Sequence, residues 1–133
     1  MNTKPKILLV EDERVTQAIT RRWLLDWGYD VVVASDGGEV MGLVEREAPN
    51  LILLDLGLDI GDVFLGRSFD GFAVLEWMRR NRAANQRQPP VIVLTGRNGP
   101  ALKERVLEAG AVAFFQKPAD RPRLRTAIQI ALE

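Results

Sequence analysis

The sequence has no cysteine and no histidine among its 133 residues. The absence of cysteine excludes a disulfide framework, a thiolate nucleophile and any Cys-ligated metal. The absence of histidine excludes a Ser-His-Asp triad and leaves the usual zinc ligand sets incomplete. Any metal bound by this chain should therefore be a hard cation held by oxygen atoms.

The sequence also has no net charge, because 18 basic residues offset 18 acidic ones. Binders of nucleic acid or of anionic membranes normally rely on a broad positive field, so we expect neither as a direct partner. The polar residues 1–6 lack the apolar core of a secretory signal, and no apolar run approaches the length of a membrane span. We therefore predict a cytoplasmic location.

Five short apolar runs recur along the chain, with helical patterns between them. A chain of this length, with 47% hydrophobic and 27% charged residues, suits one domain over residues 1–133. The first four runs show no polar alternation, which is typical of strands buried on both faces of a parallel sheet. The predicted strands cover residues 7–10, 31–34, 51–54, 91–94 and 112–115.

The first helical pattern follows the first predicted strand and is ended by Gly28. Its pattern residues lie three or four positions apart. They are Thr16, Ile19, Trp23, Leu24 and Trp27. We expect Trp23 and Trp27 to belong to the core, and Trp77, in a later helix, to be partly exposed.

Four further helical patterns complete a strand–helix alternation that is repeated five times. They cover residues 38–47, a segment after Asp70 as N-cap, about 101–109, and a segment after Asp120 with Pro122 in its first turn. The alternation predicts an open α/β sandwich with a parallel sheet. Its ligand site should lie at the carboxyl ends of the strands.

Residues 57–69, between the third strand and the third helix, are long for a loop in such a unit. Two interpretations stay open: a functional flap, or an insertion that decorates the surface. Asp59 and Asp62 add negative charge near the expected site.

Polar residues follow the predicted strands at the edge where the ligand is expected. They are Glu11, Asp12 and Glu13 after the first strand, Asp55 after the third, Thr95 after the fourth and Lys117 after the fifth. Crowded carboxylates repel one another unless a cation lies among them, and Mg²⁺, with Mn²⁺ as a substitute, suits such a site. Asp55 and Asp12 would bind it directly, Glu11 directly or through water, and the backbone carbonyl of Gly57 would complete the protein ligands.

The same residues suit phosphoryl transfer, which depends on placing groups and neutralising charge. Asp55 is the predicted nucleophile and phosphoacceptor, and would form an acyl phosphate. Thr95 and Lys117 would each donate a hydrogen bond to a phosphoryl oxygen. Singly, each residue has an ordinary alternative as a turn cap, a strand end or a surface charge, and the three acidic residues could favour the positive end of the first helix. Their joint occurrence at converging strand ends favours the site.

At these positions the motifs "LLVEDE", "LILLDL", "VIVLTG" and "FFQKP" resemble the receiver domains of response regulators, over essentially the whole chain. The resemblance implies a flavodoxin-like fold with strand order 2-1-3-4-5 and five helices. It also implies a histidine kinase or phosphotransfer protein as phosphodonor, and a downstream effector that the sequence does not name. Such a domain catalyses only its own phosphorylation and dephosphorylation, and is not otherwise an enzyme.

The resemblance further implies a switch. Thr95 would shift toward the phosphoryl group and Phe114 would swing inward, which would alter the surface formed by the fourth helix, the fifth strand and the fifth helix. That surface would then contact an effector or form a phosphorylation-dependent homodimer. Phe114 lacks the hydroxyl often found at its position, which excludes a readout that uses that hydroxyl.

The chain departs from the family pattern at two points. Glu11–Asp12 stands where two aspartates are common, which keeps the charge, and the insertion at 57–69 replaces a short turn containing proline.

Two rival functions stay open. One is an interaction module that is never phosphorylated; the other is a phosphatase acting through an aspartyl phosphate, which would need a second Asp where Gly57 stands. A nucleotide or flavin binder is disfavoured by the acidic turn after the first strand.

Overall fold

The computed structural model describes residues 3–55, 71–80, 88–96 and 100–133. Within these residues, five strands form one parallel sheet in the order β2-β1-β3-β4-β5, as predicted. The strands are β1 (Lys6–Val10), β2 (Asp30–Ala34), β3 (Leu51–Asp55), β4 (Val91–Thr95) and β5 (Ala113–Gln116). The described helices are α1 (Arg14–Asp26), α2 (Gly37–Glu47), α4 (Gly71–Arg80), α5 (Pro100–Glu108) and α6 (Arg121–Ala131).

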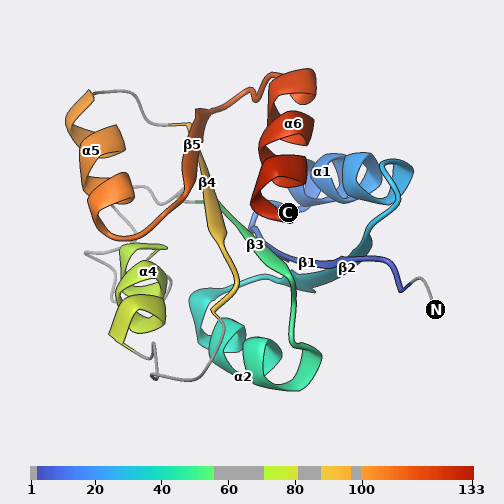
Figure 1. Cartoon of the computed structure of the whole chain (residues 1–133), viewed down its shortest axis with the longest axis horizontal. Coiled ribbons are helices and arrows are strands. Elements are labelled where there is room, and N and C mark those ends of the chain that lie inside the picture. Colours follow the sequence, from blue (N-terminus) through green and yellow to red (C-terminus); the bar gives the residue numbers. More distant parts are fainter. Residues whose placement is uncertain (1–2, 56–70, 81–87, 97–99) are drawn as a thin grey trace.

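Helices cover both faces of the sheet (Figure 1). One face packs on α1 and α6 around Leu9, Leu24 and Leu53; the other packs on α2, α4 and α5 around Leu8 and other aliphatic side chains. Every residue of β3 and β4 is buried. This double coverage explains why these strands read as continuous apolar runs.

The helix ends largely follow their sequence signals. Gly28 and Gly110 lie just beyond α1 and α5 with φ of 95° and 111°, the left-handed region in which glycine is not strained. Ala48 ends α2 in the same region, with φ of 46°, directly before Pro49. Asp120 caps α6 by accepting a hydrogen bond from the backbone N–H of Arg123.

The edge of the core departs from the helical pattern at Ile19, and the prediction that Trp23 and Trp27 belong to the core was wrong in part. Ile19 is 48% exposed, because the buried stripe of α1 runs through Thr20 and Leu24 and a single helical residue turns the side chain by about 100°. Trp23 and Trp27 are half-buried at the margin of the core, where the guanidinium groups of Arg121 and Arg125 lie over their rings.

Strand β5 begins one residue later than predicted, since its pairing with β4 starts at Ala113, and Val112 is 56% exposed.

Trp77 is half-buried, as predicted. Asp70, Gly57 and the predicted insertion at 57–69 lie outside the described residues. No helix in the described part of the chain combines the length and apolar character needed to span a bilayer.

Candidate functional site

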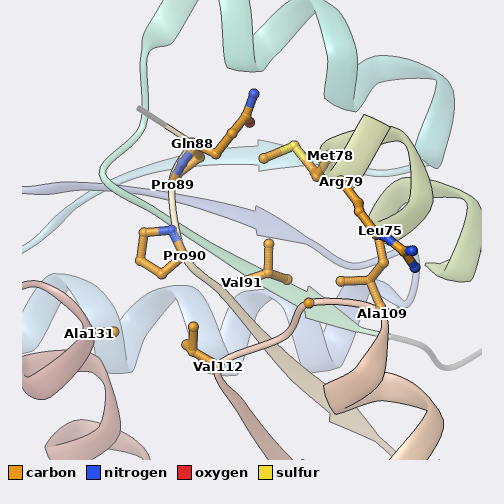
Figure 2. A pocket seen from close by; sticks show the side chains of 11 residues that line it. Leu75, Met78, Arg79, Gln88, Pro89, Pro90, Val91, Ala109, Val112 and Ala131 are labelled. Atoms are coloured by element: carbon orange, nitrogen blue, oxygen red, sulfur yellow. The ribbon is translucent and has the colours of Figure 1, made fainter. Parts of the chain in front are cut away.

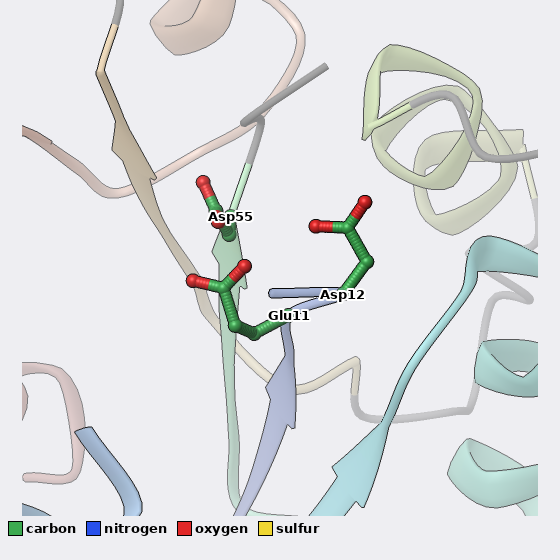
Figure 3. A group of neighbouring side chains, drawn as sticks. All are labelled: Glu11, Asp12 and Asp55. Carbon is green, nitrogen blue, oxygen red and sulfur yellow. The ribbon is translucent and has the colours of Figure 1, made fainter. Parts of the chain in front are cut away.

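Three carboxyl groups meet at the carboxyl ends of the central strands β1 and β3. Asp55 is the last residue of β3, and Glu11 and Asp12 directly follow β1. The parallel register that pairs Val10 with Leu54 brings these positions together. One carboxylate oxygen from each of the three residues lies within 4.8 Å of the others (Figure 3). Glu11 and Asp55 are buried, with 2% and 3% exposure, whereas Asp12 is exposed.

The ammonium group of Lys117 lies against two of these carboxylates. Lys117 follows β5, and its Nζ donates to Oε1 of Glu11 at 2.8 Å and forms an ion pair with Asp55. Its backbone N–H donates to the carbonyl of Thr95 at 2.7 Å, which ties this loop to the end of β4. The sequence-predicted lysine and carboxylates are therefore in direct contact.

Thr95 and Phe114 lie on the neighbouring strands. Thr95 ends β4 and is fully buried; it follows Leu94, the register partner of Asp55. Phe114 pairs with Val93, is half-buried, and packs on the core cluster beneath α2, α4 and α5. Gly57, the remaining predicted site residue, lies outside the described residues.

The electrostatics of the cluster favour bound positive charge. Burial, with the neighbouring carboxyl group of Asp55, raises the pKa of Glu11 to about 8, although Lys117 opposes the shift. Burial lowers the pKa of Lys117, but its pairing with Asp55 and Glu11 outweighs this effect and raises it above the usual value. The ammonium thus stays charged, and it faces two buried carboxyl groups that repel each other when both are ionised.

Glu13 has a different function from its two acidic neighbours. Its carboxylate caps α1, accepting hydrogen bonds from the backbone N–H groups of Val15 at 3.0 Å and Thr16 at 2.6 Å. The Thr16 hydroxyl and these N–H groups lower the pKa of Glu13. For Glu13 the interpretation as a residue at the positive end of the helix is correct, while Glu11 and Asp12 join the cluster around Asp55.

A residue that the sequence did not single out also reaches this turn. The side-chain amide of Gln17, in the second turn of α1, donates to the backbone carbonyl of Glu11 at 2.8 Å. A glutamine on a helix surface is common, and nothing in its spacing marks a contact with a backbone carbonyl. Only the folded turn reveals it.

The donor set fits a hard divalent cation. Glu11, Asp12 and Asp55 supply carboxylate oxygens, the ligands that Mg²⁺ and Mn²⁺ prefer. The ammonium of Lys117 between Glu11 and Asp55 shows that the cluster already accommodates one positive charge. These three residues could therefore hold such an ion.

A cavity of about 400 Å³ lies at the other end of the sheet, near the start of β4 (Figure 2). Leu75 and Met78 of α4 and Val91 of β4 line it. Arg79 is the one charged residue among its described lining residues, which include no carboxylate. Among the described residues, the buried carboxyl groups are those of Glu11 and Asp55, which lie at the carboxyl ends of the strands, where the fold class predicts a ligand site.

Comparison with known proteins agrees with this geometry. Residues 7–129 match the family model of the response regulator receiver domain. The protein named "Probable transcriptional regulator ycf27" from Porphyridium aerugineum is 32% identical over 129 residues, which cover 97% of this chain and 48% of that protein. The chain spans about half the length of the curated relatives that it matches first.

Two solved receiver domains have the same fold. A CheY-like response regulator receiver domain protein from Methanospirillum hungatei has a TM-score of 0.79 and 28% identity, with 98% of this chain and 94% of that chain covered. The BeF3-activated N-terminal receiver domain of Klebsiella pneumoniae RstA has a TM-score of 0.81 and 26% identity, with 96% and 98% covered.

Proposed function

Because this chain belongs to the response regulator receiver domain family of two-component signalling, we propose that it accepts a phosphoryl group on Asp55. The observation that carries the proposal is the buried carboxylate of Asp55 at the end of β3, in an ion pair with Lys117 and beside Glu11 and Asp12. A nucleophile, a cation for the transferred oxygens and a set of metal ligands are thus together.

In the proposed reaction, a carboxylate oxygen of Asp55 attacks the phosphorus of a phosphohistidine in a histidine kinase or phosphotransfer protein, or of a small phosphodonor. The new O–P bond forms as the P–N bond of the phosphohistidine breaks; the leaving imidazole nitrogen keeps the electron pair and takes a proton from solvent. Lys117 already contacts Asp55, so its ammonium is within reach of an oxygen added to that carboxylate. The Thr95 hydroxyl would donate to another phosphoryl oxygen.

Mg²⁺, with Mn²⁺ as a substitute, would neutralise charge on the transferring oxygens. We propose Asp12, Asp55 and Glu11 as its protein ligands, Glu11 directly or through water, with the backbone carbonyl of Gly57 completing the set. The local charge supports this proposal: the carboxyl groups of Glu11, Asp12 and Asp55 lie close together, and the single ammonium of Lys117 contacts only the two buried ones. A second cation would relieve the repulsion that remains.

We further propose that phosphorylation changes the surface formed by α5, β5 and α6, the fourth helix, fifth strand and fifth helix of the sequence prediction. Phe114, half-buried beside β4, would be the moving aromatic and Thr95 the residue that couples it to the phosphoryl group. The altered surface would contact a downstream effector or a second copy of the chain. Residues 1–133 would act as one cytoplasmic receiver domain with an insertion at 57–69.

Incubation with acetyl phosphate and Mg²⁺, followed by intact-protein mass measurement, tests the proposal. We expect the mass gain of one phosphoryl group in the wild type, no gain in Asp55→Asn, and an unchanged gain in Asp30→Asn, which alters an exposed aspartate on β2. Absence of a gain in the wild type, with the small donor and with a panel of histidine kinases, would favour the unphosphorylated interaction module. Turnover of an added phosphomonoester would favour the phosphatase.

A further inference from the structure

The turn between β1 and α1 is held by contacts from β2 and from α1. The backbone N–H of Glu11 donates to the carbonyl of Ala34 at the end of β2, at 3.0 Å. The carbonyl of Glu11 accepts from the side-chain amide of Gln17, at 2.8 Å. The same amide nitrogen lies 3.5 Å from the hydroxyl of Ser35, directly after β2. Both backbone polar groups of Glu11 are therefore bound, one by β2 and one by α1.

The following residues add to this restraint. The backbone N–H of Glu13 donates to Oε2 of Glu11 at 3.2 Å, while the Glu13 carboxylate caps α1. Asp12 lies between these two fixed residues and its side chain is exposed. Burial does not confine the Asp12 side chain as it confines that of Glu11, so the place from which its carboxylate can reach an ion is set by the backbone of the turn.

We propose that Gln17 is a positioning residue for the cation site: it fixes the backbone of the β1–α1 turn so that Glu11 and Asp12 present their carboxylates to the same ion as Asp55. The proposal rests on the proposed function. Ligand geometry in metal sites is commonly set by groups behind the ligands, and loss of such a group typically weakens metal binding by about 10- to 100-fold. Gln17 acts on backbone rather than on a ligand oxygen, so we expect the lower end of that range.

A purely structural tether would have a different signature. If Gln17 only stabilised the junction between β1 and α1, its removal would lower resistance to unfolding and leave metal binding by the folded protein unchanged. If Gln17 positions the ligands, its removal lowers the affinity of the folded protein for metal about 10-fold, whatever the change in the urea midpoint of unfolding. At saturating metal, the maximal rate of phosphorylation should return close to that of the wild type, because Asp55, Thr95 and Lys117 are untouched.

The test uses Gln17→Met, which keeps the length of the side chain but removes the N–H donor. Gln17→Asn is the second variant, because it keeps the amide but is too short to reach the carbonyl of Glu11. Gln129→Met, on the exposed face of α6, is the matched control. Three quantities are measured for each protein: Mn²⁺ binding by electron paramagnetic resonance, the Mg²⁺ concentration that half-saturates phosphorylation by acetyl phosphate, and the urea midpoint of unfolding without metal.

We expect both Gln17 variants to bind Mn²⁺ about 10-fold more weakly and to need about 10-fold more Mg²⁺ for half-saturation, while Gln129→Met matches the wild type. Binding by both Gln17 variants within twofold of the wild type would overturn the inference, whatever the urea midpoints show. A wild type that binds no metal and takes no phosphoryl group would instead contradict the proposed function, and the inference with it.

Discussion

The apolar middle of β3 and its polar end are buried to the same degree, since Leu53 has 0% of its surface exposed and Asp55 has 3%. Their energetic contributions are opposite. Leu53 packs into the cluster between the sheet and the helices α1 and α6, where burial of apolar surface stabilises the fold. Asp55 places a carboxylate near a second buried carboxyl group and depends on Lys117 for compensation. The core of this protein thus supports a strand end that is itself electrostatically unfavourable, a common property of functional sites.

The largest effect on stability is expected in the apolar middle of β3. Leu53→Ala should lower the free energy of unfolding by about 2–5 kcal/mol, because it removes buried methyl groups and leaves a cavity. Leu107→Ala, on the 40% exposed side chain in α5, should change it by less than about 0.5 kcal/mol. Urea unfolding measures both, and a loss below about 1 kcal/mol for Leu53→Ala would show that β3 is not the centre of the core.

Removal of the compensating charge should come next in size. Lys117→Met leaves Glu11 and Asp55 without their shared ammonium, and we expect a loss of about 2–3 kcal/mol at pH 8 without metal, below the full value for a buried pair because Lys117 is 23% exposed. Added Mg²⁺ should stabilise this variant more than it stabilises the wild type. Equal stabilisation of both proteins by Mg²⁺, measured from their melting temperatures, would contradict this account of the cluster.

A third prediction concerns pH. The folded pKa of Glu11 is raised to about 8 from 4.5, so the folded state binds more protons than the unfolded state between these values. The contribution of Glu11 to stability is therefore fully present below pH 4.5 and is lost as the pH rises through about 8. In metal-free buffer, Glu11→Gln should reduce the fall in stability between pH 5 and pH 8 by more than about 1.4 kcal/mol, the equivalent of one pKa unit.

Urea unfolding across this pH range, for the wild type and Glu11→Gln side by side, provides the measurement. Parallel pH profiles for the two proteins would show that Glu11 is ionised in the folded state at neutral pH. Glu45→Gln, which changes a carboxylate on α2 away from the cluster, is the control and should leave the pH profile of the wild type unaltered.

The smallest predicted effect is at the margin of the core, where the ring of Trp23 packs against the cluster beneath α1 and α6. Arg121→Gln removes the guanidinium that lies 5.0 Å from the centre of the Trp23 ring and should destabilise the protein by about 0.5–1 kcal/mol. Arg123→Gln, on the exposed side of the same helix, should have a smaller effect. If the two variants have equal urea midpoints, the contact between α1 and α6 through Trp23 does not stabilise the fold.

The sheet could be predicted from the sequence because both its faces are covered. Coverage removes the need for polar residues within β3 and β4, so their apolar runs appear without interruption. The start of β5 was less predictable, since an edge strand is defined by where its pairing begins, and Val112 has the residue type of a strand without its burial. Half-burial of Trp23 and Trp27 was not predictable from spacing, because it depends on arginines contributed by α6.

The convergence of Glu11, Asp12, Asp55 and Lys117 could also be predicted, because the carboxyl ends of parallel strands lie along one edge. The separate function of Glu13 could not. Three consecutive acidic residues look alike in a sequence, and the backbone of the turn decides which of them faces the sheet and which caps the helix. Gln17 was missed for the same reason, because its partner is a backbone carbonyl six residues away.

The central claim, that the buried end of β3 is the phosphoacceptor, is tested most directly by locating the acyl phosphate. Protein treated with acetyl phosphate and Mg²⁺ is reduced with borohydride, which converts an aspartyl phosphate to homoserine, and is then digested for peptide mass analysis. We predict homoserine at position 55, with Asp12 and Glu11 recovered unreduced. Homoserine at another aspartate, or an acid-stable phosphate ester on Thr95 in place of an acyl phosphate, would contradict the account.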